Sequence, residues 1–85
     1  MNDHWRVIDN CLIYTGLNFV AFAEPANKPN IVMWKVRITK GDGSEDKSVI
    51  INYYTLGSAV QDVERFFNLS IPEQREQFEM SSRVS

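Results

Sequence analysis

Cysteine and histidine each occur only once in the 85 residues, as Cys11 and His4. A single cysteine excludes a disulfide within the chain, and one residue of each type is too few for a zinc-binding cluster. The chain also contains no glycine-rich loop of the kinds that hold nucleotide phosphates. These absences argue against the common enzyme classes, and we expect no catalytic residues, no cofactor and no metal ion.

The sequence has no excess of positive charge and no long apolar segment. Nine Lys and Arg against eleven Asp and Glu give a formal net charge of -2, which offers no overall attraction to nucleic acid. No segment has the length of a membrane span, and the N-terminus lacks the basic and apolar regions of a signal peptide. Together with the single cysteine, these features predict a cytoplasmic protein that does not bind a membrane.

The residues that are present are typical of a folded domain. Hydrophobic residues make up 44% of the chain and aromatic residues 12%, which is ample material for a small core. We expect a single small α+β domain over residues 1–85, with frayed ends at residues 1–4 and 81–85.

Three segments have the composition and alternation of β-strands. Residues 30–40 alternate apolar and polar side chains, residues 47–55 are rich in β-branched and aromatic types, and residues 17–24 precede a loop with two prolines. Short connections favour antiparallel neighbours. The expected fold is therefore an antiparallel meander sheet of three to four strands, with Val32, Trp34, Val36, Ile38, Val49, Ile51 and Tyr53 on the face that packs against a helix.

Residues 5–14 decide whether a fourth strand exists. The turn-like pair Asp9-Asn10 and the β-branched residues around it favour an edge strand or a short hairpin. A helix from Asp3 to Tyr14 is the alternative, because apolar residues within this segment also recur at helical spacing.

The C-terminal third predicts one main helix and a short second helix. Apolar residues recur at helical spacing over residues 57–68, where Ser58 and Gln61 fit a capping box. A second helix is expected over residues 70–80, with a Ser70–Glu73 capping box. Its few apolar residues predict weak docking.

The segment of residues 38–50 holds a dense group of acids. It begins like a calcium-binding loop, but Lys47 stands where the loop needs glycine and Tyr53 where it needs a bidentate glutamate. The dipeptide Asp42-Gly43 is typical of a tight hairpin turn. We therefore predict a turn with an exposed acidic tip, formed by Asp42, Glu45 and Asp46, and weak metal binding is the alternative.

The sheet face opposite the main helix is the predicted interaction surface. A single helix covers one face of such a sheet, so the other face mixes apolar and basic side chains, and either Phe19 with Ala21 or Val20 with Phe22 joins it. Met, Tyr and Arg are enriched at protein interfaces, although an antiparallel sheet also commonly leaves one face in water. With the acidic tip included, the predicted partner-binding residues are Met33, Lys35, Arg37, Asp42, Glu45, Asp46, Ile50 and Tyr54.

These features predict a non-enzymatic protein-binding module, an inhibitor or adaptor that occludes a larger intracellular enzyme or nucleic-acid-handling complex. Its acids would meet a basic groove on that partner, and a homodimer is also reasonable. The nearest alternative is a single-stranded nucleic-acid-binding protein that uses Lys35, Arg37 and Tyr54; an enzyme built on Cys11 is a more distant one.

The chain is similar in general style to small phage-encoded inhibitors such as anti-CRISPR proteins. The shared features are small size, an acidic balance, a hairpin sheet, one clear helix and no catalytic set, and no residue motif carries the similarity. It implies a role in phage counter-defence.

Overall fold

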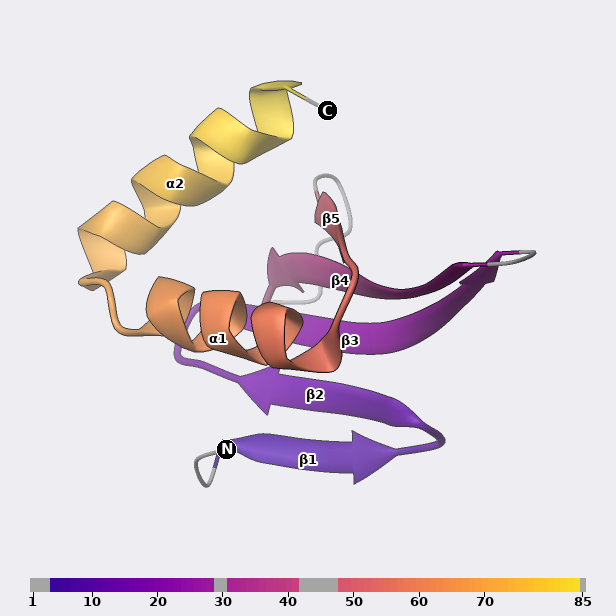
Figure 1. Ribbon diagram of the computed structural model, residues 1–85. Helices are drawn as coiled ribbons and strands as arrows, with labels where there is room; N and C mark the ends of the chain where they lie inside the picture. Colours follow the sequence, from indigo (N-terminus) through magenta and orange to yellow (C-terminus); the bar gives the residue numbers. More distant parts are fainter. Residues whose placement is uncertain (1–3, 29–30, 42–47, 85) are drawn as a thin grey trace.

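Five strands in chain order form one antiparallel sheet, and two helices follow them (Figure 1). The computed structural model describes residues 4–28, 31–41 and 48–84, and the side chains within 4–26, 33–41 and 48–81. The elements are β1 (Trp5–Ile8), β2 (Cys11–Thr15), β3 (Phe19–Lys28), β4 (Ile31–Lys40), β5 (Ser48–Tyr53), α1 (Leu56–Phe67) and α2 (Ile71–Val84). The predicted α+β meander is confirmed, but the sheet has five strands and not three to four.

The additional strand comes from the hairpin of β1 and β2. Asp9 and Asn10 have positive φ values of 50 and 64°, the backbone conformation that two-residue hairpin turns require and that Asp and Asn tolerate better than most residues. Ile8 lies opposite Cys11 directly after this turn. The helix considered for residues 3–14 is therefore wrong, and the segment supplies two short strands.

The register of the strands shows which side chains share a face. Val36 lies opposite Ala23 on β3 and Ile51 on β5, and Ile38 lies in the same way opposite Ala21 and Val49. Directly opposite residues point to the same face of a sheet, so the predicted common face is confirmed for Trp34, Val36, Ile38, Val49, Ile51 and Tyr53. The side chain of Val32 lies outside the described residues.

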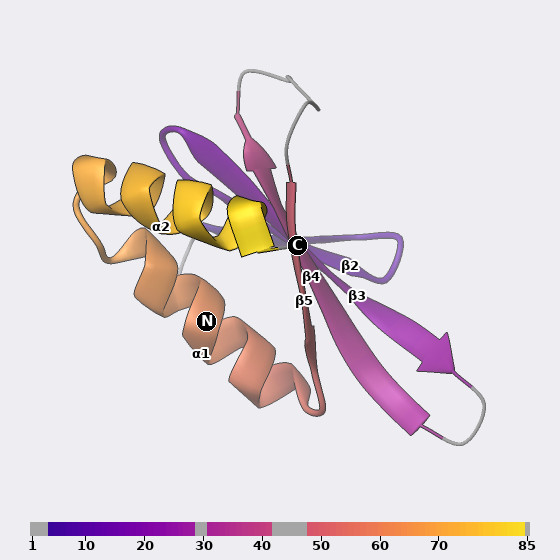
Figure 2. The same ribbon diagram turned by 90° about the horizontal axis from the view of Figure 1, so that it is seen from above.

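Both helices cover this one face (Figure 2), and the core lies between them and the sheet. The buried apolar side chains are Leu12, Tyr14, Phe19, Ala21, Ala23, Val36, Ile38, Val49, Ala59, Val63 and Phe78. Because Phe19 and Ala21 belong to this core, Val20 and Phe22 point to the opposite face. Aromatic rings join the layers: Phe67 of α1 stacks on Tyr14 at 4.2 Å between ring centroids.

The start of α1 differs from the prediction. Thr55 caps the helix, because its Oγ1 accepts a hydrogen bond of 3.1 Å from the Ser58 backbone amide, and Ser58 lies within the first turn. The predicted capping box of Ser58 and Gln61 is therefore wrong. A threonine that precedes the apolar stripe by one turn serves the same purpose, which is to satisfy an amide that has no partner in the helix.

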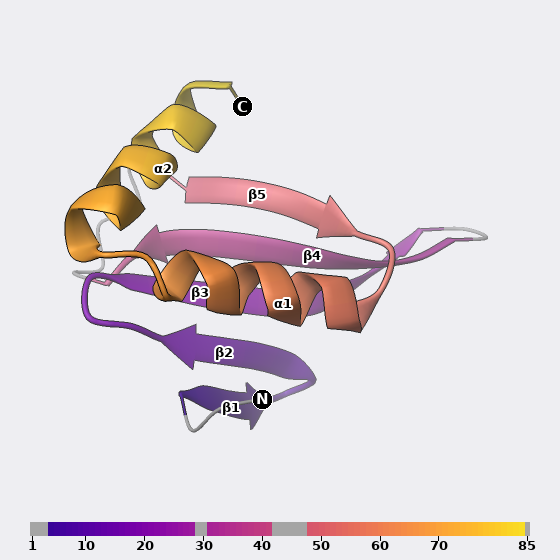
Figure 3. The same ribbon diagram turned by 60° about the vertical axis from the view of Figure 1, so that its left-hand side comes forward.

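Helix α2 is longer than expected. The predicted Ser70–Glu73 pair is confirmed, since the Ser70 hydroxyl accepts from the Glu73 amide at 3.4 Å and donates to its carboxylate at 2.8 Å. The helix continues to Val84 and, with 14 residues, exceeds the 12 of α1. Phe78 is buried against Phe19, with 5.0 Å between the ring centroids. This contact packs α2 against β3, and the weak docking expected for this helix stays a prediction. In Figure 3, α2 crosses near the beginning of β5 and extends past it.

Two glycines provide a matched test of the packing between β2 and α1. A Cβ at Gly16 would overlap the Phe67 ring and lie 3.2 Å from the Phe19 carbonyl oxygen, whereas a Cβ at Gly57 would meet nothing within 4 Å. Gly16→Ala is expected to lower the free energy of unfolding by about 1–3 kcal/mol, because the stacked ring has to move. Gly57→Ala, in the first turn of α1, is expected to raise it by up to about 1 kcal/mol.

Urea denaturation of the two variants and the parent protein measures both changes. Equal effects of the two substitutions would contradict this packing of Phe67 against the turn after β2.

Candidate interaction face

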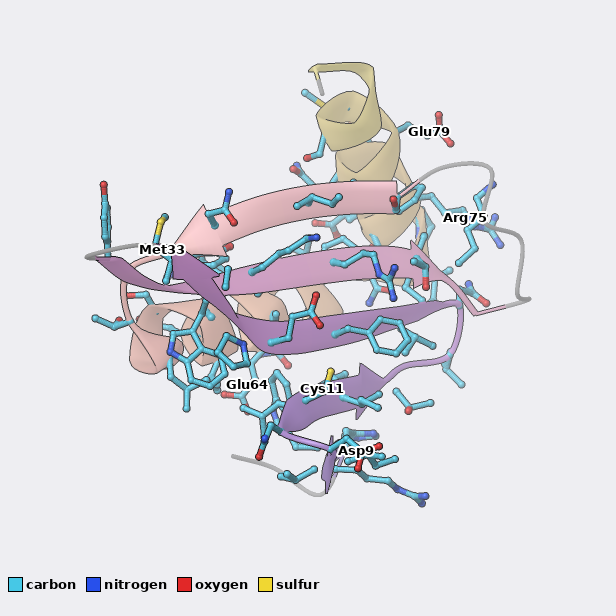
Figure 4. All side chains as sticks on the ribbon, turned by 90° about the vertical axis from the view of Figure 1, so that its right-hand side faces the viewer. Asp9, Cys11, Met33, Glu64, Arg75 and Glu79 are labelled. Atoms are coloured by element: carbon cyan, nitrogen blue, oxygen red, sulfur yellow. The ribbon has the colours of Figure 1, made fainter. Side chains whose placement is uncertain are left out.

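The sheet face that points away from both helices, called the open face here, is the candidate functional site (Figure 4). Its residues follow from the register. They are Arg6, Ile8, Cys11, Ile13, Thr15, Val20, Phe22, Glu24, Ala26, Met33, Lys35, Arg37, Thr39, Ser48, Ile50 and Asn52. No element of the described part of the chain covers them.

The middle of the open face is a single row of side chains that runs across all five strands. Each member lies directly opposite the next, and the order is Arg6, Ile13, Phe22, Arg37, Ile50. With about 4.8 Å between strands, this central row is about 19 Å long. Side chains at such opposite positions are close neighbours, so the row forms one mixed strip in which Ile13 and Phe22 are adjacent and Arg37 separates them from Ile50.

Phe22 and Arg37 form the centre of this row. The Arg37 Cζ atom lies over the Phe22 ring, 5.1 Å from its centroid, which is within the range of a cation–π interaction. Phe22 is half-buried and Arg37 is exposed. The contact holds an aromatic ring and a guanidinium group together on the surface, two groups that often dominate binding energy at interfaces.

The charge of the open face is opposite to that of the whole chain. Its described charged side chains are Arg6, Lys35 and Arg37, which are basic, and Glu24, which is acidic. The described side chains of the two helices instead carry five carboxylates and two arginines. The formal net charge of -2 is therefore distributed unevenly: the open face is basic and the helical layer is acidic.

Cys11 also lies on the open face. Burial raises the pKa of its thiol, and the nearby Glu24 carboxylate raises it further, against a lowering by Arg37. A raised pKa keeps the thiol protonated and a weak nucleophile. His4 stacks on Tyr14, with 5.2 Å between the ring centroids, and Tyr14 faces the helices. Cys11 and the Tyr14 ring on which His4 stacks therefore lie on opposite faces of the sheet, an arrangement that does not bring Cys11 and His4 together. The apolar residues around Cys11 predict a buried side chain, whereas Cys11 is half-buried.

The predicted site residues fall into three groups. Met33, Lys35, Arg37 and Ile50 lie together on the open face, as predicted. Tyr54 follows the end of β5 and is 78% exposed, so it stands beside the sheet and not within a strand. The acidic tip of Asp42, Glu45 and Asp46 lies outside the described residues, and its role stays a prediction.

Three residues of the central row are not among the predicted partner-binding residues, although Phe22 with Val20 was one of the two alternatives for this face. Arg6 and Ile13 depend on the hairpin of β1 and β2, which competes with a helix in the sequence. The position of Phe22 depends on which face of β3 is buried. The small neighbours Ala21 and Ala23 are the sequence feature that could have indicated the buried face. Alternating small and large apolar residues allow a helix to approach on the side of the small ones, which leaves Phe22 on the other side.

A groove beside β5 is the second feature of the molecule. It has a volume of about 390 Å³ and lies between the β4–β5 pair and the two helices. Its walls are mostly apolar, with Val49 and Ile51 from the sheet and Phe66 and Phe78 from the helices. Tyr53 and Asp62 both line this groove.

No family model matches the chain, and neither a curated protein nor a solved structure matches it. Within residues 4–28, 31–41 and 48–84, no three His, Cys, Asp or Glu side chains are grouped so that they could hold a metal ion. In the same ranges, neither helix is long and apolar enough to cross a membrane. The function proposed below therefore rests on the geometry and chemistry of the open face.

The Tyr53–Asp62 contact predicts a loss of stability at high pH. Burial, the hydrogen bond to Asp62 and the negative charge of Asp62 raise the pKa of Tyr53 from 10.0 to about 12. A raised pKa in the folded state means that this contribution to stability is complete below pH 10.0 and is lost as the pH rises to about 12. Tyr53→Phe is expected to remove this part of the pH dependence.

Urea denaturation at a series of pH values measures the effect, and phenolate absorbance follows the titration of Tyr53. Asp62→Asn is expected to lower the pKa of Tyr53 towards its ordinary value. Identical pH profiles for the parent protein and Tyr53→Phe would show that the contact does not form.

Proposed function

We propose that the protein is a non-enzymatic protein-binding module that attaches to a larger intracellular partner through its open face. The observation that carries this proposal is the central row, an apolar and basic strip across five strands that neither helix covers. A rigid sheet presents these groups with little loss of conformational freedom on binding, which favours affinity. As an inhibitor or adaptor, the module would occlude the partner surface that it covers.

The chemistry of the open face defines the kind of partner surface that it fits. Phe22, Ile13 and Ile50 require apolar contacts, while Arg6, Lys35 and Arg37 require carboxylates around them. Complementary charge increases the rate of association and selects the partner. We infer an apolar patch edged by carboxylates on an enzyme or on a nucleic-acid-handling complex. In the latter case, the protein would compete with other ligands for that patch.

The acidic tip implies a different contact on the partner. Asp42, Glu45 and Asp46 would meet a basic groove, whereas the open face would meet acids. We prefer the open face as the main contact because it joins charge to apolar area, and apolar burial is the larger source of affinity. Charge reversal at the tip and on the open face separates the two contributions.

Single-stranded nucleic acid is the second candidate ligand. Phe22 with Arg37 over its ring, and Arg6 and Lys35 nearby, is an arrangement that suits a stacked base and its phosphates. Glu24 on the same face and the acidic balance of the chain oppose this function. Phe22 replaces Tyr54 as the aromatic residue on which this alternative depends.

Arg37→Glu and Arg75→Glu form a matched pair of charge reversals that tests the proposal. Both arginines are exposed, but Arg37 lies in the central row and Arg75 on α2. In affinity capture from cell lysate, a partner protein is expected with the parent chain and with Arg75→Glu, and not with Arg37→Glu. Titration calorimetry with that partner should show about a 30-fold weaker affinity for Phe22→Ala, the effect of a 2 kcal/mol hot spot.

Two results would contradict the proposal. One is capture of the same proteins by all three chains, which would place binding elsewhere. The other is binding of single-stranded DNA or RNA oligonucleotides that weakens steeply with salt and is lost in Arg37→Glu, which would favour the nucleic-acid alternative.

A further inference from the structure

The two edges of the sheet are protected to different degrees. At one edge, β1 has only four residues and includes Arg6; short length and charge are features that prevent an edge from pairing with another chain. At the other edge, β5 is six residues long, reads Ser-Val-Ile-Ile-Asn-Tyr, and contains no charge, proline or glycine. Such a strand has the composition of segments that pair with copies of themselves.

The groove lies beside the unprotected edge at β5, and the two together form a candidate binding surface. Ile51 of β5 points into it and is still 39% exposed, although Val36 and Val49 beside it are buried. In Figures 1 and 3, α2 continues past β5 on the side away from β4. A sixth strand next to β5 would therefore lie under α2, with alternate side chains directed towards the groove.

We propose that β5 pairs antiparallel with β5 of a second copy of this chain, around a two-fold axis perpendicular to the sheet. The pairing continues the sheet across both copies and keeps all four helices on one side. Because the same strand is used by both copies, the interface is self-complementary and closed. The proposal concerns self-association and goes beyond the partner binding described above.

Two features identify a second copy as the occupant. The absence of charge on β5 means that a two-fold pairing brings no like charges together. Val49, Ile51 and Tyr53 of the second strand share the helix-facing side, so they offer apolar groups to an apolar groove. Stable interfaces bury roughly 1,200 Å² or more, and a strand edge about 20 Å long is small. The proposed dimer therefore requires side chains in the two grooves to bury additional area.

The dimer also enlarges the open face. The central row ends at Ile50, on the edge strand β5, and the second copy extends it with its own row. Two open faces on one continuous sheet would bind a partner with two equivalent patches more tightly through avidity.

Ile50→Lys and Ile8→Lys test this pairing as a matched pair. Both residues are on the open face of an edge strand, with exposures of 47% for Ile50 and 54% for Ile8. Sedimentation equilibrium of the isolated protein is expected to give twice the chain mass of 9.8 kDa. The same dimer is expected for Ile8→Lys, and a monomer for Ile50→Lys, where two lysines would approach across the axis.

Amide hydrogen exchange of the parent protein supports the test where Ile50→Lys fails to fold. The β5 amides that point away from β4 should exchange at least about tenfold more slowly in concentrated than in dilute protein. A parent protein that stays monomeric at millimolar concentration, a dimer that survives Ile50→Lys, or β5 exchange independent of concentration would overturn the proposal. Phe22→Ala should keep the dimer even where it weakens partner binding about 30-fold, so the two proposals fail separately.

Discussion

The packing of both helices against a single face of the sheet is the constraint on which the rest of the structure depends. Ala21 and Ala23 at the middle of the sheet and Ala59 on α1 are almost fully buried, and their small size allows close approach of helix and sheet. Phe19, Phe67 and Phe78 then fill the space at the sides of this contact. A close-packed interior of this kind accepts neither larger residues nor a shift of register without loss of stability.

One covered face leaves another uncovered, and its composition carries the functional argument. A face that only meets water gains nothing from a phenylalanine in its centre, whereas Phe22 under the Arg37 guanidinium is a suitable anchor for binding. The same division gives the open face a net positive charge and the helices a net negative charge. In the proposed function, the helices support the sheet and the open face contacts the partner. Its incompletely covered edge at β5 provides a separate route to self-association.

Much of the fold can be predicted from the sequence, because alternation and capping are local properties. The common face of Val36, Ile38 and Val49 and the Ser70–Glu73 pair were predicted correctly. Local rules could not decide between hairpin and helix around Asp9 and Asn10, since both patterns are present and only tertiary packing selects one. The same limit left the position of Phe22 undecided between the two faces, because the buried side of β3 depends on where α1 lies. The residues of the acidic tip lie outside the described part of the chain, so its role stays a prediction.

Solvent accessibility on the two sides of β3 tests the central claim most directly. Ala21, Phe22 and Ala23 are consecutive, yet Phe22 should be accessible and its two neighbours covered. In dilute protein, a soluble paramagnetic agent should broaden the NMR signals of the Phe22 ring strongly and those of the two alanine methyl groups hardly at all. Equal protection of all three residues would show that the open face is covered, and would contradict its assignment as a binding surface.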